Sequence, residues 1–270
     1  MSERSKQNYE EYYEPIEEIG IGGFARVYKG REKKKKEMRA IKVMSLEKIK
    51  EELLSQYEIE EIEEQLKICI EGFITEFKIM EICSKNNENS VKRYEYFNNK
   101  DNFVIIMELC DLNLLQLLNK RIEEENKGFN IKEIYEIMKG LNNTFKIMKE
   151  NNIIHRDLKL ENILIKYKDK EKYIVKLTDY GCSKRLISLS RNCNTCKGTV
   201  VYMSPEILKG EEYNYKCDLW SIGIIIYRLI FGRLPYSGKT ESELINNIDK
   251  FDSKFIKIEN KELNDLIKKL

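Results

Sequence analysis

IIHRDLKLENILI, residues 153–165, places two acids, two cations, an amide and the chain's only histidine between apolar runs. The flanking isoleucines and leucine predict two short buried strand-like segments that hold a polar turn rigidly. A turn that only reverses the chain would use Gly, Asn or Pro, without Asp, Lys and Asn at fixed offsets. The carboxylate of Asp157, the cation of Lys159 and the amide of Asn162 suit phosphoryl transfer.

The composition bounds the possible classes. A chain of 270 residues is long enough for one large domain or two smaller lobes with a sizeable core. The net charge of +2 gives no argument for bulk attraction to nucleic acid or to a membrane. The longest apolar run, residues 223–231, contains Arg228 and is far too short to span a bilayer. We therefore expect neither nucleic acid nor membrane as a partner.

The seven cysteines show no disulfide framework, which indicates reduced thiols and a cytoplasmic location, with the nucleus as an alternative. Cys193 and Cys196 form a C-x-x-C pair. A structural zinc site needs four ligands, and no second pair lies nearby, so we do not favour zinc there.

A glycine-containing turn, GIGGFARV, occupies residues 20–27 between two segments with strand character. Glycines let backbone N–H groups approach a polyphosphate closely because no Cβ blocks them. Ala25 replaces the third glycine of G-x-G-x-x-G, so a Rossmann turn and a plain hairpin are rival interpretations. Val27 and Tyr28 follow at once and favour a strand over the helix that a Rossmann turn opens.

Residues 39–44 predict a short strand in which Lys42 is the one lysine of an otherwise apolar stretch. Taken alone, an edge-strand lysine reaching water is an equally good interpretation. The following stretch, residues 45–83, is rich in Glu, Lys, Leu and Ile and predicts helix, with Gly72 as the expected interruption. Residues 90–97 and 102–109 predict a β-hairpin.

The second half of the chain predicts mainly helices. The expected elements are helices over residues 114–122, 132–149, 218–231, 242–248 and 261–270, and a strand over residues 173–178. The strand ends in Asp179-Tyr180-Gly181, and Asp179 offers the carboxylate oxygen that Mg²⁺ requires.

These motifs, in this order over residues 13–270, resemble the catalytic domain of eukaryotic protein kinases. Residues 155–162 match H-R-D-x-K-x-x-N, Asp179-Tyr180-Gly181 matches D-F-G with a Tyr for the Phe, and Ser204-Pro205-Glu206 is similar to A-P-E. Lys159, two residues after Asp157, resembles the serine/threonine type, in the calcium/calmodulin-dependent or related groups.

The resemblance implies an α+β, two-lobed kinase fold. It divides the chain into a polar leader over residues 1–12, an N-lobe over 13–109 with an insertion at 46–70, and a hinge and C-lobe over 110–270. The C-lobe is expected to be incomplete at its C-terminal end, because the chain stops before the last helices of the kinase fold.

The same resemblance assigns the reaction. ATP and Mg²⁺ are the expected cofactors, and Ser/Thr hydroxyls of protein substrates are the acceptors. Asp157 is the expected base, Lys159 acts on the γ-phosphate, and Lys42 binds the phosphates with Glu76 as its partner. Glu71 and Glu81 are rival partners for Lys42.

Further contacts follow by position. Mg²⁺ is expected on Asn162 and Asp179. The expected ATP contacts are Gly20, Ile21, Gly22, Gly23, Phe24, Val27, Ala40, Lys42, Met107, Glu108, Cys110 and Leu164.

Regulation is expected at Thr195, where many kinases carry an activating phosphate placed there by an upstream kinase or by autophosphorylation. Arg156 and Lys184 supply cations that could pair with it. Asp218 is expected to tether the catalytic loop. Arg228 stands where kinases that select basic substrates often carry a glutamate. The alternative of a pseudokinase acting as a nucleotide-binding scaffold is weakened by the presence of Lys42, Asp157 and Asp179.

Overall fold

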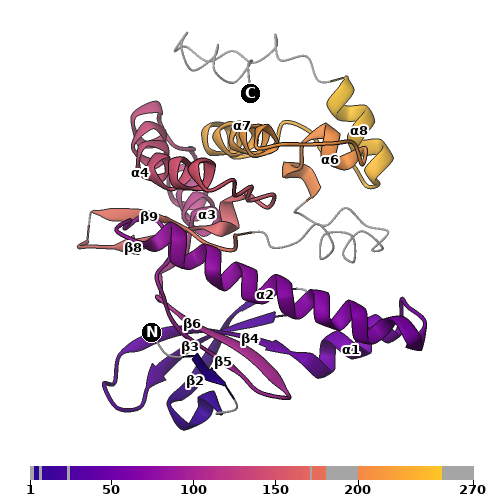
Figure 1. Ribbon diagram of the computed structural model, residues 1–270. Coiled ribbons are helices and arrows are strands. Elements are labelled where there is room, and N and C mark those ends of the chain that lie inside the picture. Colours follow the sequence, from indigo (N-terminus) through magenta and orange to yellow (C-terminus); the bar gives the residue numbers. More distant parts are fainter. Residues whose placement is uncertain (1–2, 6–7, 23–24, 171, 181–199, 251–270) are drawn as a thin grey trace. The chain divides into compact units, whose positions relative to one another are not determined.

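A computed structural model describes residues 3–5, 8–22, 25–170, 172–180 and 200–250. These residues belong to two compact units that divide between Cys110 and Asp111 (Figure 1). The first unit is rich in β-sheet and the second is mainly helical, which confirms the predicted α+β class. The helix expected over residues 261–270 lies outside the described residues.

The first unit is built on a six-stranded sheet with the order β1-β5-β6-β4-β3-β2. Its strands are β1 (Glu3–Ser5), β2 (Tyr13–Ile21), β3 (Ala25–Glu32), β4 (Met38–Ser45), β5 (Arg93–Asn98) and β6 (Asn102–Met107). β2 and β3 form the hairpin expected around the glycines, and β5 and β6 form the second expected hairpin. The central strand β6 is apolar, and Val104, Ile105 and Ile106 on it are fully buried.

Two helices in the first unit, α1 (Leu46–Leu54) and α2 (Ile62–Ser84), account for the expected long helical stretch. The interruption does not fall at Gly72, which lies buried inside α2. It falls instead after α1, where the Ser55 hydroxyl donates to the carbonyl of Glu52, and a 3-10 turn η2 (Ile59–Glu61) precedes α2. A buried glycine costs a helix only about 1 kcal/mol, which tertiary packing can offset.

The described residues of the expected polar leader, 3–5 and 8–12, lie against the sheet of the first unit. β1 pairs in parallel with β5, and a 3-10 turn η1 (Tyr9–Glu11) leads into β2. Tyr9 is buried in one cluster with Tyr13 and Phe97, against which Tyr12 also packs. Aromatic burial therefore fixes this segment on the sheet, although its composition is polar.

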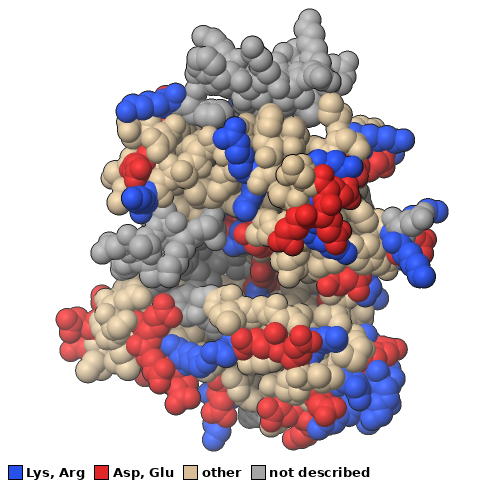
Figure 2. All heavy atoms as spheres, turned by 180° about the vertical axis from the view of Figure 1, so that it is seen from behind, with Lys and Arg blue, Asp and Glu red and all other residues tan. Residues whose placement is uncertain are grey.

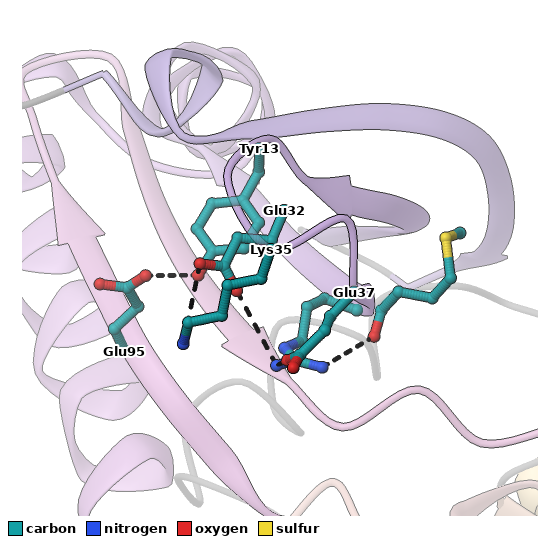
Figure 3. Close-up of polar contacts among 7 residues, drawn as sticks. Tyr13, Glu32, Lys35, Glu37 and Glu95 are labelled. Carbon is teal, nitrogen blue, oxygen red and sulfur yellow. Dashed lines mark hydrogen bonds and ion pairs between the residues drawn. The ribbon is translucent and has the colours of Figure 1, made fainter.

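A polar network surrounds Tyr13 of β2 (Figure 3). Its other members come from β3, the β3–β4 turn, β4 and β5. The Tyr13 hydroxyl donates to Glu95 on β5. Arg39 pairs with Glu37 and lies 3.9 Å from Glu32, which also lies 3.9 Å from Lys35. Burial raises the pKa of Tyr13 well above its usual value, so the phenol remains a hydrogen-bond donor at neutral pH.

The second unit combines helices with a small three-stranded sheet, order β7-β8-β9. Its strands are β7 (Leu112–Asn113), β8 (Ile163–Tyr167) and β9 (Tyr173–Leu177). Its helices are α3 (Leu114–Glu125), α4 (Ile131–Glu150), α6 (Pro205–Leu208), α7 (Lys216–Phe231) and α8 (Glu241–Asp249), with 3-10 turns η3 (Leu160–Asn162) and η4 (Val200–Tyr202).

Capping sets two of these helices precisely. Asn113 begins α3 and Asn130 begins α4, each in a reciprocal capping box with the residue three positions later. The structure confirms the four expected helices over residues 114–122, 132–149, 218–231 and 242–248, as α3, α4, α7 and α8.

Charges of both signs are interspersed on the face shown in Figure 2. Within the part of the chain that the structure describes, every helix is too short or too polar to cross a bilayer.

The Tyr13–Glu95 hydrogen bond yields a stability prediction. Tyr13→Phe keeps the buried ring against Phe97 but removes the donor to Glu95. We expect the free energy of unfolding to fall by about 1 kcal/mol, measured by urea denaturation. The matched control is Tyr135→Phe, because the Tyr135 side chain is exposed. Equal stability of Tyr13→Phe and the wild type would show that this bond contributes nothing.

Candidate active site

Lys42 and Glu76 form the central ion pair of the first unit. The Lys42 Nζ lies 2.7 Å from Glu76 Oε1, and the two side chains are only 12% and 9% exposed. Lys42 extends from β4, whose neighbours β3 and β6 fix it on both sides. Glu76 extends from α2 one residue before the buried Phe77. The partner of Lys42 is therefore Glu76, among the three glutamates considered.

The glycine turn closes the β2–β3 hairpin. Gly20 pairs with Val27 across the hairpin, and the N–H of Gly22 donates to the carbonyl of Ala25 at 2.7 Å. Ile21 is 75% exposed at the tip, so an apolar surface is left open there. Gly23 and Phe24 lie outside the described residues.

The expected adenine contacts of the first unit lie on β3, β4 and β6 or just after β6. Ala40 is buried and directly opposite Met107 in the sheet. Val27, on the neighbouring strand β3, lies opposite Lys42 of β4. After β6, the N–H of Glu108 donates to the carbonyl of Lys92 at 2.8 Å, and the side chain of Cys110 is half-buried.

The catalytic loop gathers three of the predicted residues in the second unit. Asn162 Nδ2 donates to Asp157 Oδ2 at 2.9 Å and to the Asp157 carbonyl at 2.8 Å. The Lys159 Nζ lies 2.8 Å from the same Oδ2. Asp157 Oδ1 is buried without a hydrogen-bond partner. The carboxylate is thus fixed through one oxygen, and the other oxygen is available to accept a proton.

Asp218, a buried residue of α7, holds the backbone of this loop. Its two carboxylate oxygens accept from the N–H groups of His155 at 2.8 Å and Arg156 at 2.9 Å. Arg156 has a positive φ of 67°, a conformation that is unfavourable for a non-glycine residue unless its surroundings hold it. The expected tether is therefore present, and it fixes the strained residue directly before Asp157.

His155 is fully buried, and its ring connects the loop to the segment that follows β9. Its Nε2 donates to the carbonyl of Thr178 at 3.0 Å, and its ring lies 5.5 Å from the Tyr180 ring. Thr178 N–H in turn donates to the carbonyl of Asn162 at 3.0 Å. Asp179, between Thr178 and Tyr180, has a positive φ of 52°. Asp179 and Asn162 are thereby tied to each other through Thr178.

The donor set fits a magnesium ion. Mg²⁺ takes oxygen ligands and is held in enzymes by one or two protein groups together with substrate phosphates. Asn162 uses its Nδ2 toward Asp157, which leaves its amide oxygen for a cation. Asp179 supplies a carboxylate. Among the described residues, no cluster of three or more His, Cys, Asp or Glu could hold a metal without such help.

A second polar group lies beside the catalytic loop. The Arg228 Nη1 donates to the Tyr202 hydroxyl at 2.7 Å. Burial raises the pKa of Tyr202 to about 12; Arg228 and a hydrogen bond with the Leu160 backbone act in the opposite direction, and the charge of Glu161 raises the pKa further. Arg228 Nε and Glu161 Oε2 are both buried without hydrogen-bond partners.

Other predicted residues are placed separately. Leu164 lies half-buried on β8, within the three-stranded sheet. Arg156 Nε is buried without a hydrogen-bond partner. Thr195 and Lys184 lie outside the described residues, as do Cys193 and Cys196.

Sequence reasoning missed two contributions to the site. Arg93 was only a residue of a predicted hairpin, yet it is buried and paired with Glu81 of α2. Tyr202, the phenol that joins Arg228 to the loop, was not singled out either. The available signal was weak: a charged residue two positions after Val91, and a tyrosine two residues before Ser204-Pro205-Glu206.

Comparison with known proteins identifies the family. The protein kinase domain model matches residues 13–270. Calcium-dependent protein kinase 5 of Plasmodium falciparum (isolate 3D7) is 31% identical over 254 residues, covering 92% of this chain and 40% of that protein.

Two relatives outside that group match comparably. Serine/threonine-protein kinase TIO of Arabidopsis thaliana is 31% identical over 91% of this chain and 16% of its own length. Serine/threonine-protein kinase atg1 of Dictyostelium discoideum is 33% identical over 85% of this chain and 32% of its own length. The chain thus spans less than half the length of these relatives. By its match over residues 13–270, this chain belongs to the protein kinase domain family.

Proposed function

We propose that this chain is an ATP-dependent serine/threonine protein kinase, which transfers the γ-phosphate of ATP to Ser or Thr hydroxyls of protein substrates. The serine/threonine kinases among its relatives support the acceptor class. The observation that carries the proposal is the Asp157 carboxylate. One of its oxygens is held by Lys159 and Asn162, and the other is buried without a hydrogen-bond partner.

The proposed reaction needs little covalent chemistry from the protein. Lys42, held by Glu76, binds phosphate oxygens of ATP, and the backbone N–H groups of the glycine turn approach the same phosphates. Ala40, Val27 and Leu164 contact the adenine, and the backbone at Glu108 and Cys110 hydrogen-bonds its edge. Asp157 accepts the proton of the substrate hydroxyl as the oxygen attacks, and Lys159 stabilises charge on the transferred group.

Magnesium is the proposed metal cofactor, held by Asn162 and Asp179. When bound, it supplies positive charge that neutralises the phosphate oxygens. Asn162 has two tasks in this scheme, because its Nδ2 orients Asp157 while its amide oxygen would hold the metal. Substitution of Asn162 should therefore affect both the orientation of Asp157 and the binding of Mg²⁺.

Regulation by phosphorylation of Thr195, by an upstream kinase or by autophosphorylation, remains a proposal. Arg156 supports it, because its Nε is buried without a hydrogen-bond partner beside the catalytic Asp157. A phosphate near a guanidinium can order a loop through charge-assisted hydrogen bonds. We also propose a cytoplasmic location. The free thiols of Cys69, Cys83, Cys110 and Cys217 agree with a reducing compartment.

Asp157→Asn tests the enzyme proposal. Asn can keep the hydrogen bonds to Lys159 and Asn162, but its amide cannot accept the substrate proton. We expect kcat for phosphorylation of a generic protein with Mg·ATP to fall by about 10²- to 10⁴-fold. The thermal midpoint serves as the control and should stay close to that of the wild type. Equal phosphate incorporation by both proteins would overturn the enzyme proposal.

Arg228 provides a prediction about substrate choice. Its guanidinium lies beside the loop at Tyr202 and repels a basic substrate side chain that approaches there. We expect a peptide array to show no dominant Arg preference two or three residues before the acceptor.

Arg228→Glu should raise the relative rate for peptides with Arg at those positions by about tenfold, because a repulsive charge becomes attractive. Arg233→Glu, also on the second unit, controls for a general change in charge. A dominant Arg preference in the wild type would contradict the assignment of Arg228.

A further inference from the structure

Arg93, the first residue of β5, is a buried arginine outside the chemistry described above. Its side chain is 6% exposed, and its Nη2 lies 2.5 Å from Glu81 Oε2. Its guanidinium carbon lies 3.7 Å above the centre of the Phe77 ring. A buried guanidinium requires charge and hydrogen-bond partners, and both of these partners belong to α2.

The geometry of α2 separates its two paired carboxylates. Five residues of α2 between positions 73 and 81 face the sheet. At about 100° per residue, they span about 140° around the helix axis. Their order around the axis is Glu76, Met80, Phe73, Phe77 and Glu81. The three apolar side chains are buried. Cys83 and Gly72 are also buried and lie beyond Glu76 around the axis, so Glu76 stands within the buried face and Glu81 stands at its margin.

The two carboxylates bind different strands. Glu76 pairs with Lys42 on β4, and Glu81 pairs with Arg93 on β5. In the sheet order, β5 and β4 are the two neighbours of β6. The helix is thus attached on both sides of the central strand.

Apolar packing seats α2 on the sheet between these attachments. Phe73 lies 5.1 Å from Phe103, and Phe77 lies 4.5 Å from Tyr96, measured between ring centres. Apolar contacts are non-directional and tolerate some rotation of the helix about its axis. Two ion pairs about 140° apart around the helix axis, each to a different strand, oppose such rotation.

We propose that Arg93 is a positioning residue for phosphoryl transfer: through Glu81 and Phe77 it fixes the rotation of α2 and so holds Glu76 on Lys42. The inference rests on the proposed function, because Arg93 acts on catalysis only through Lys42.

A purely structural role for Arg93 makes a different prediction. Replacing a buried ion pair by an apolar residue of similar size is often neutral or stabilising. Arg93→Met keeps an unbranched apolar stem against Phe77 and should preserve the fold. A structural role therefore predicts unchanged catalysis, whereas a positioning role predicts catalytic loss in a stable protein.

The experiment compares kcat/KM for ATP and thermal midpoints among four proteins: wild type, Arg93→Met, Arg93→Lys and Arg121→Met. Arg121 is the matched control in the second unit, where its guanidinium lies 4.4 Å from the Phe129 ring and 2.7 Å from Glu133. We expect Arg93→Met to lose about ten- to a hundredfold in kcat/KM with its midpoint retained. Arg93→Lys should recover part of the loss, and Arg121→Met should show none.

A second background separates positioning from a general effect. In Glu76→Gln, the ion pair that Arg93 serves is already weakened, so adding Arg93→Met should cost less than about a further twofold. Equal losses in both backgrounds would overturn the proposal, as would wild-type kcat/KM in a folded Arg93→Met. If Arg93→Met does not fold, Glu81→Ala replaces it, because the Glu81 side chain is 58% exposed, and the same losses are expected.

Hydrogen exchange distinguishes failure of this proposal from failure of the proposed function. Amides of residues 73–82 should exchange faster in Arg93→Met than in wild type, in a measurement that needs no turnover. An inactive wild type would overturn the proposed function, and faster exchange in Arg93→Met would still support the attachment of α2 by Arg93. Unchanged exchange would overturn the proposal that Arg93 fixes α2, whatever the activity of the variant.

Discussion

The Lys42–Glu76 ion pair is the constraint on which the first unit depends. Two side chains that are nearly removed from water lie 2.7 Å apart, and each would be costly if left alone. Lys42 is fixed by a central position in the sheet, whereas Glu76 stands on a helix that must be held at the right rotation. Hydrophobic contacts of Phe73 and Phe77 provide most of the attraction between helix and sheet, and the charges decide which carboxylate meets which cation.

The second unit solves a similar problem with hydrogen bonds. Asp218 lies 63 residues after His155 in sequence, yet it accepts from two successive backbone N–H groups and stabilises the positive φ of Arg156. Because Asp157 follows immediately, its carboxylate inherits this rigidity. Lys159 and Asn162 then occupy only one of its oxygens. Positioning of this kind leaves a buried acceptor free at a fixed place, which is what general-base catalysis requires.

Periodicity and motif order predicted most elements of the fold, because turns, caps and apolar strands are local signals. The burial of Tyr9 was not predicted, because it depends on Phe97, far away in the chain. Gly72 was wrongly expected to break a helix that its tertiary contacts maintain. The ion pair of Lys42 with Glu76 agrees with the partner expected from the sequence ahead of Glu71 and Glu81. The role of Arg93 was not predictable, since a buried arginine is recognisable only after its partners on α2 are known.

A double-mutant cycle on kcat/KM for ATP tests the central claim most directly. Lys42→Met and Glu76→Gln are measured singly and together under identical Mg·ATP conditions. If Glu76 acts by holding Lys42, each single variant loses activity, by about a hundredfold for Lys42→Met, and the double variant is no worse than Lys42→Met alone. Losses that multiply in the double variant would show that the two residues act independently, and would contradict the account.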